Sequence, residues 1–341
     1  MRIFRLGDEG PEVLDIQERL RALDLAIDPD EVGHGFGPST DRAVRAFQVR
    51  RSLPVDGLVG GDTWAQLVEA GYRLGDRTLY LHAPFHRGDD VQALQRKLNA
   101  LGFDAGREDG MFGPNTDAAI REFQRNVGEE PDGIVGLHAI EVLERMRPLE
   151  HGRSRALVRE EEELRQRRAS IEGQVLAIDP GEPGAGSDPT YAVAEALRNE
   201  LASMGAAPSV LRRRDEPLGA TERAKVANEM GASTCVSIEL ATGLPEAAGP
   251  TVSYFGSDQT HSPGGMLLAQ LILEEVEAAL GVRGRLQRLS ISMLRETRMP
   301  AVQVEPAFIT NEHEAEWVDD PEFAALVGRA IAVGVKRFFA G

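Results

Sequence analysis

The sequence Phe-Gly-Pro-Ser-Thr-Asp at residues 36–41 returns as Phe-Gly-Pro-Asn-Thr-Asp at residues 112–117. The same offset of 76 residues carries Asp56-Gly57 onto Asp132-Gly133. Upstream of the hexapeptides the offset is 78 residues, so the first copy holds two extra residues in its loop. The upstream matches are Val13 with Val91, Gln17 with Gln95, Leu20 with Leu98, and Leu23 with Leu101. Two copies at this spacing indicate tandem small domains, because solenoid repeats have periods of about 20 to 50 residues.

Each copy has the pattern of helix, loop, helix, turn and helix, with apolar residues at helical spacing. The second helix follows Gly-Pro-Ser-Thr or Gly-Pro-Asn-Thr, where we expect a hydroxyl or amide oxygen to cap the free amides. The Asp-Gly pairs predict tight turns, and Phe47 and Phe123 are expected in the cores. The chain therefore begins with two all-α three-helix modules, which we place at residues 1–74 and 80–148.

Residues 149–172 follow Pro148 and are highly charged. Glu161 and Arg165 have the i, i+4 order that favours an exposed helix. We interpret this segment as a charged helical linker. A docking helix for a partner is the alternative.

From residue 173 to residue 341 the pattern changes to alternating strands and helices. Residues 175–178 form a short apolar run that enters Asp179-Pro180-Gly181, as a strand ending in a loop would. Further strands are expected at 209–211, 234–240, 251–255 and 301–309, and helices at 190–204, 218–230, 264–280 and 321–339. This order predicts an α/β domain with a mostly parallel, twisted sheet covered by helices. Functional residues are expected where the strands end.

Composition and charge exclude several classes of function. The formal net charge of −17 argues against binding to nucleic acid or to an anionic membrane surface. The single cysteine, Cys235, excludes an internal disulfide or a CxxC metal site, and we expect it to be buried. No apolar run approaches the roughly 18 residues of a membrane span, so no direct membrane insertion is expected. The first residues lack the pattern of a secretory signal, which favours a cytoplasmic protein.

Three runs in the last domain carry a resemblance to a known family. They are Ile178-Asp179-Pro180-Gly181, Cys235-Val236-Ser237-Ile238, and residues 294–305 with Phe308-Ile309 and Asn311. Their order resembles the catalytic domain of zinc-dependent N-acetylmuramoyl-L-alanine amidases. The two repeats are similar to the peptidoglycan-binding-like modules found beside bacterial cell-wall hydrolases. The resemblance thus covers nearly the whole chain and implies the same multidomain fold.

The resemblance also implies where a metal site would lie, and the residues there do not match the family. Its first and second zinc-binding His positions fall on Glu182 and Glu239. The position of its helix Glu falls near residues 186–188, where there is no Glu. Only the late Glu, which polarises the attacking water in the family, is kept, as Glu305. Glu305 is therefore a vestigial general-base position, and we expect no metal and no cofactor.

Other residues offer weak substitutes for the missing ligands. Within this domain only His261 and His313 are present, both in expected loops away from the family's ligand positions. The three glutamates together would suit Mg²⁺, Ca²⁺ or Mn²⁺ better than zinc, which leaves a site for a harder metal open. Residues 212–214 are three consecutive arginines, most simply a solvated surface, although an acidic partner or a phosphate is an alternative.

The full architecture resembles an actinobacterial family of amidase homologues that have lost their metal ligands. That resemblance implies a cytoplasmic regulator of peptidoglycan precursor synthesis that binds and stimulates the UDP-N-acetylglucosamine enolpyruvyl transferase under control of a serine/threonine kinase. It also implies partners with a forkhead-associated domain or a role in lipid II export. The family's C-terminal phosphorylated Thr residues have no counterpart here, because no Ser or Thr follows Thr310. Another site, for example Ser170 in the linker, would have to serve.

Two other functions remain open from the sequence. One is an active, zinc-dependent N-acetylmuramoyl-L-alanine amidase that hydrolyses the amide bond between muramic acid and L-alanine. The other is a wall-binding protein whose repeats hold a peptidoglycan fragment.

Overall fold

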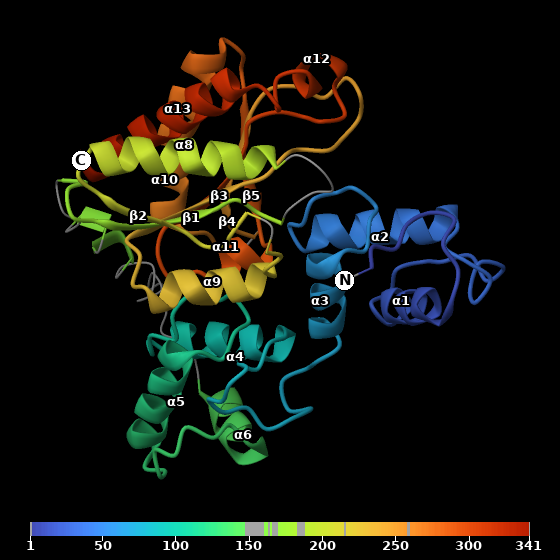
Figure 1. The fold of residues 1–341 in the computed structure, drawn as a ribbon. Helices are drawn as coiled ribbons and strands as arrows, with labels where there is room; N and C mark the ends of the chain where they lie inside the picture. The colour runs from blue at the N-terminus through green and yellow to red at the C-terminus, as the bar shows by residue number, and fades with distance from the viewer. Residues whose placement is uncertain are drawn as a thin grey trace. The chain divides into compact units, whose positions relative to one another are not determined.

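The computed structural model describes residues 2–146, 160–162, 164–165, 170–182, 188–214, 216–257 and 260–340. The chain forms two compact units, Met1–Glu160 and Glu161–Gly341 (Figure 1). Most of the linker predicted at residues 149–172, including all of residues 149–159, lies outside the described residues. No helix among the described residues is long and apolar enough to cross a membrane.

The first unit contains the two predicted three-helix modules. The first module has α1 (Pro11–Ala22), α2 (Pro38–Arg50) and α3 (Gly61–Glu69), and the second has α4 (Asp89–Ala100), α5 (Pro114–Val127) and α6 (Leu137–Arg145). Phe47 and Phe123 are 1% and 0% exposed, which confirms their prediction as core residues. The repeat in the sequence is therefore a repeat in the structure.

The predicted capping of α2 by a side chain of its own first turn is wrong. The helix begins at Pro38 with Gly37 as N-cap and no capping side chain, because proline is suited to the first helical position. The free amides of Ser39 and Thr40 instead donate to the carboxylate of Glu31, each at 2.9 Å. These hydrogen bonds lower the pKa of Glu31 to about 2, against the opposing effect of burial.

A buried glutamine braces the Asp-Gly turn in each module. Gln124 Nε2 donates to Asp132 Oδ1 at 2.7 Å, and Gln124 Oε1 accepts the Gly133 amide at 2.9 Å. Gln48 makes the same two contacts with Asp56 and Gly57, at 2.7 and 2.9 Å. Gly57 and Gly133 have φ of 74° and 75°, a conformation that other residues rarely adopt.

The second unit is an α/β domain around a sheet with strand order β2-β1-β3-β6-β4-β5. The strands are β1 (Val175–Asp179), β2 (Ala207–Val210), β3 (Thr234–Ile238), β4 (Thr251–Phe255), β5 (Arg285–Leu289) and β6 (Ala301–Glu305). Neighbouring strands are parallel except for β4 and β6, which are antiparallel. The predicted mostly parallel sheet is confirmed. Strand β5 was not expected, because its Arg-rich sequence lacks an apolar pattern.

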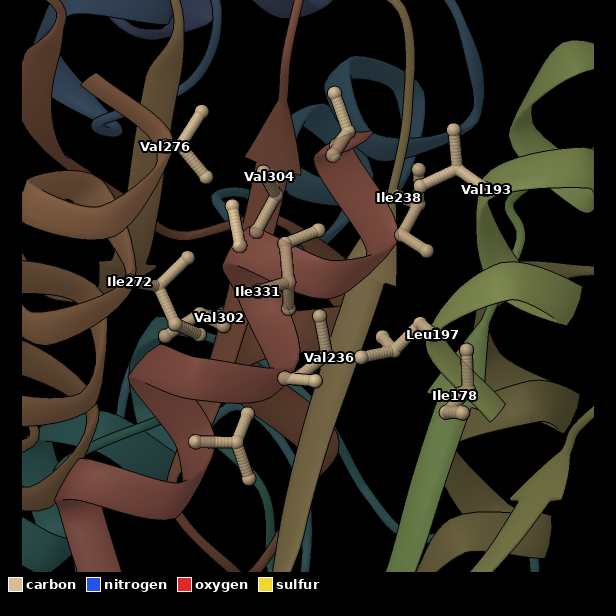
Figure 2. Close-up of a cluster of buried hydrophobic side chains, with 14 of the residues drawn as sticks. Ile178, Val193, Leu197, Val236, Ile238, Ile272, Val276, Val302, Val304 and Ile331 are labelled. Atoms are coloured by element: carbon tan, nitrogen blue, oxygen red, sulfur yellow. The ribbon is translucent and has the colours of Figure 1, made fainter. Parts of the chain in front are cut away.

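Helices cover both faces of this sheet (Figure 1). They are α8 (Pro189–Ser203), α9 (Ala220–Glu229), α10 (Pro263–Leu280), α11 (Ser292–Glu296), α12 (Glu312–Ala315) and α13 (Pro321–Ala340). Figure 2 shows side chains of β1, β3 and β6 pointing toward those of α8, α10 and α13 in one apolar core. Examples are Ile178, Val236 and Ile331, which are at most 2% exposed. The other face carries the polar residues Asp179, Ser237 and Gln303, and α9 and α11 lie against it.

The hydrogen bonds of Gln124 predict that removing its side chain destabilises the second module locally. Gln124→Ala leaves the buried amide of Gly133 without an acceptor, which costs about 1–3 kcal/mol. Hydrogen exchange of the α5 amides measures this as faster local opening. Asn126→Ala, on the exposed side of the same helix, is the control and is expected to change opening by less than about 0.5 kcal/mol. Equal exchange in the two variants would contradict the role assigned to Gln124.

Candidate functional site

The ends of β1, β3 and β6 bring the predicted site residues together. These strands are adjacent and parallel, so Asp179, Glu239 and Glu305 lie at one edge of the sheet, which we call the carboxyl edge. The pairing continues past β3, since the Glu239 amide donates to the Val304 carbonyl at 3.0 Å. Glu239 and Glu305 therefore lie at the ends of adjacent strands, where the alternating pattern places the functional residues of such a sheet.

Asp179 is fully buried at the centre of the carboxyl edge. Its Oδ2 accepts the Ser237 hydroxyl at 2.8 Å, and its Oδ1 accepts the Gly181 amide at 3.1 Å. Arg223 Nε lies 2.6 Å from Oδ1. Burial raises the pKa of Asp179, and the guanidinium of Arg223 opposes that shift.

Arg223 connects two strands from its position on α9. Its side chain is 3% exposed, and its Nη2 lies 3.9 Å from Glu239 Oε1. It also donates to the Leu218 carbonyl. The sequence analysis did not single out this residue. The sequence offers one indication of its burial: Arg223 lies next to Ala224 and four residues before Ala227, two positions that are buried in the helix.

Glu239 lies over the backbone of Gly181 at the first turn after β1. A Cβ at residue 181 would overlap the Glu239 carboxylate. Burial and, to a smaller extent, the charge of Asp179 raise the pKa of Glu239 to about 8. The charge of Arg223 lowers this pKa, and the charges of Glu305 and Glu182 raise it slightly. Glu182 and Glu305 thus each lie within electrostatic reach of Glu239.

Glu305 is half-buried at the end of β6. Burial raises its pKa to about 7, against the lowering effects of a hydrogen bond from Gln303 and the charge of Arg285. The Arg285 guanidinium stands 5.2 Å from the centre of the Phe308 ring. A carboxyl group with this pKa exchanges a proton near neutral pH, but a general base also needs a substrate that is held and polarised.

The residues near the helix-Glu position of the amidases serve the fold. Gly186 and Ser187 lie outside the described residues, and Asp188 is the N-cap of α8, where it accepts the Tyr191 amide at 3.1 Å. Its other oxygen accepts Arg212 Nη2 at 2.8 Å, in an ion pair whose side chains are 0% and 8% exposed. Asp188 is therefore committed to a structural ion pair.

Arg212 corrects the interpretation of residues 212–214 as a solvated surface. Its guanidinium is buried and also donates to the carbonyls of Pro180 and Gly181. The sequence does not distinguish Arg212 from the arginines that follow it, and the neighbouring Arg213 has a side chain that is 92% exposed.

The residues of the carboxyl edge do not fit a zinc ion. Catalytic zinc is held mainly by imidazole or thiolate ligands, with a carboxylate at most beside them, and it keeps one open position. No group of three His, Cys, Asp or Glu residues with metal-binding geometry occurs in the part of the chain that the structure describes. His261 pairs with Gly256 beyond β4, and His313 lies in α12. Cys235 is fully buried in β3, as predicted, and burial raises the pKa of its thiol.

Comparisons with known proteins agree with this architecture. A family model described as N-acetylmuramoyl-L-alanine amidase matches residues 177–337, and one described as a putative peptidoglycan binding domain matches residues 9–67 and 87–143. The N-acetylmuramoyl-L-alanine amidase CwlM of Mycobacterium tuberculosis is 35% identical over 98% of this chain and 89% of its own length. The amidase CwlL of Bacillus licheniformis is 30% identical over 39% of this chain and 43% of its own length. These matches confirm the predicted resemblance and fold class.

Solved structures are similar to the second unit. An N-acetylmuramoyl-L-alanine amidase from Clostridium difficile 630 is 26% identical with a TM-score of 0.44, covering 48% of this chain and 95% of that chain. Ami1 from Mycobacterium smegmatis is 22% identical with a TM-score of 0.46, covering 50% of this chain and 98% of that chain.

The buried ion pair predicts that Arg223→Met destabilises the second unit. The substitution leaves the Asp179 carboxylate buried without its partner, which costs about 3–5 kcal/mol. Urea unfolding followed by Trp317 fluorescence, in a Trp64→Phe background, measures the loss. Arg213→Met removes an exposed arginine next to the site and is expected to have little effect. Similar midpoints for the two variants would show that the ion pair is not a main support of the domain.

The raised pKa of Glu239 predicts a dependence of stability on pH. Because this pKa rises from 4.5 to about 8 on folding, the folded chain binds more protons between these values, and its free energy of unfolding falls as pH rises through them. Glu239→Gln removes this effect. The free energy of unfolding of the variant relative to that of the parent therefore increases from pH 5 upward, and the difference is largest above about pH 8. The exposed Glu246→Gln is the control. Parallel stability curves for parent and Glu239→Gln would contradict this account.

Proposed function

We propose that this chain, which belongs to the family of the CwlM protein of Mycobacterium tuberculosis, is a catalytically inactive amidase homologue. The observation that carries the proposal is the replacement of imidazole ligands by a network of carboxylates and arginine at the carboxyl edge. Following the family resemblance, Glu182 and Glu239 fall at the His positions, and Arg223 Nη2 lies 3.9 Å from Glu239 Oε1.

The charges at this edge are already neutralised from within the chain. Arg223 contacts both Asp179 and Glu239, so its guanidinium supplies positive charge between the ends of β1 and β3. A Glu239 with a pKa of about 8 is largely protonated at neutral pH, and a protonated carboxyl is a poor metal ligand. In the amidases the nucleophile is a water activated by the metal ion, so without the metal Glu305 has no activated water to deprotonate.

The role we propose for the inactive domain is regulatory. Following the family resemblance, the chain acts in the cytoplasm, where it binds and stimulates the UDP-N-acetylglucosamine enolpyruvyl transferase. Forkhead-associated-domain proteins and lipid II export proteins are proposed as further partners. Ser170 is exposed, so it is accessible to a kinase that would control these interactions.

The alternative is an active amidase that cleaves the bond between muramic acid and L-alanine. The amidase family model and the names of the relatives favour it. It requires zinc ligands beyond those that the described residues bring together.

Elemental analysis after incubation with zinc tests catalytic inactivity directly. We expect far less than one zinc per chain and no release of muropeptides from purified peptidoglycan. The double variant Glu182→His with Glu239→His restores two imidazoles and is expected to raise zinc content. Stoichiometric zinc in the parent protein, together with amide hydrolysis that Glu305→Gln abolishes, would establish the amidase alternative.

Regulation is tested by phosphate release from phosphoenolpyruvate and UDP-N-acetylglucosamine. Purified enolpyruvyl transferase is assayed with the parent protein and with Ser170→Glu, which imitates the charge of a phosphate. We expect a severalfold higher rate with Ser170→Glu, whereas Ser203→Glu, at the end of α8, serves as a charge control. Unchanged rates with every variant would overturn the proposed partner.

A further inference from the structure

The two edge strands of the sheet, β2 and β5, differ in what they present to solvent. Each pairs with one neighbour among the described strands, β2 with β1 and β5 with β4. An edge strand presents unpaired amide and carbonyl groups on its outer side, which form a template for pairing with another extended chain. Proteins usually block such edges with proline, bulges or charge.

Strand β2 is blocked by a proline. The Ala207 amide donates inward to the Gln174 carbonyl at 2.8 Å. Because successive residues of a strand direct their backbone groups to opposite sides, Pro208 lies at an outward position. It has no amide hydrogen to offer there.

Strand β5 contains no proline, and the charge that it carries is basic, which repels another basic edge but not an acidic strand. The Arg285 amide donates to the Pro250 carbonyl at 2.8 Å, and the Leu289 carbonyl accepts the Gly256 amide at 3.1 Å. Residues 285 and 289 therefore face β4, and Leu286 and Arg288 direct their amides and carbonyls outward. Four main-chain hydrogen-bonding groups are thus available on a strand that contains no proline.

The surface around β5 is basic, although the chain as a whole carries a net charge of −17. Arg283, Arg285 and Arg288 are exposed, and no acidic residue occurs between positions 278 and 295. Neither Arg283 nor Arg288 forms an ion pair with another described residue; the Arg288 guanidinium donates only to the Ser257 carbonyl, at 3.3 Å. Leu286, between these arginines, is 42% exposed.

The start of β5 is held firmly. The Gly284 amide donates to Glu277 Oε1 at 2.6 Å, and a Cβ at Gly284 would collide with the Pro250 carbonyl. A strand fixed in its extended conformation loses little conformational freedom when a second strand pairs with it.

We propose that β5 binds an acidic, extended segment of a partner protein by strand addition. The outward groups of Leu286 and Arg288 supply main-chain hydrogen bonds, Leu286 supplies an apolar contact, and Arg283 and Arg288 pair with carboxylates on the added strand. The charge excludes a second copy of β5, because two such edges would bring arginines against arginines. This inference goes beyond the proposed function and does not depend on catalytic inactivity.

The probe is a fluorescein-labelled peptide, Asp-Val-Glu-Val-Asp-Val-Glu, titrated with the full chain and followed by fluorescence polarisation. We expect saturable binding with a dissociation constant below about 1 mM, which weakens as salt screens the charges. A peptide with Lys at every acidic position is expected to show no binding.

Leu286→Pro is the decisive variant, because it places on β5 the block that Pro208 provides on β2. It removes one outward amide and leaves the pairing with β4 intact, so binding is expected to fall at least tenfold. Leu286→Thr keeps that amide and is expected to retain most of the binding. Arg288→Glu is expected to lose binding at least tenfold as well.

Equal binding by Leu286→Pro and Leu286→Thr would overturn strand addition. Equal binding of the acidic and lysine peptides would overturn the charge selection. Dimers seen by analytical ultracentrifugation that Leu286→Pro abolishes, without peptide binding, would assign the edge to a second copy and refute the proposal.

Discussion

The second unit depends on the buried ion pair of Asp179 and Arg223. Removing two charges from water is costly, and the pair persists because each charge has further polar partners: Ser237 and Gly181 for the carboxylate, and the Leu218 carbonyl for the guanidinium. The contacts join β1 to β3 and α9, so one arginine fixes three elements at the edge of the sheet where chemistry is expected. Glu239, which follows β3, lies beside the same arginine.

In the inactive homologue that we propose, the same ion pair accounts for how the amidase fold persists without a metal centre. A bound cation would otherwise be needed to offset several carboxylates in one place. Here Arg223 supplies one positive charge, and raised pKa values of about 8 and 7 leave Glu239 and Glu305 partly protonated near neutral pH. Under this proposal, the fold is separable from the chemistry that its relatives are named for.

Patterns that repeat or alternate were predictable from the sequence, whereas single polar contacts were not. The repeat predicted both modules, and the apolar runs at 175–178 and 234–240 predicted two strands of the sheet. Strand β5 was missed because an exposed edge strand needs no apolar alternation. Arg212 was assigned to the surface because composition cannot separate one buried arginine from its exposed neighbours. Glu31 caps α2 from a loop outside the helix, so no local capping pattern could reveal it.

The arrangement of the sheet separates the carboxyl edge from the outer side of β5. Antiparallel pairing of β4 with β6 puts Thr251 opposite Glu305, and β5 continues outward from β4. Arg285 at the start of β5 is therefore close enough to lower the pKa of Glu305. A chain that pairs with β5 would lie on its outer side, two strands beyond β4 and outside the carboxyl network. Binding at this edge consequently needs neither an open active site nor a metal ion.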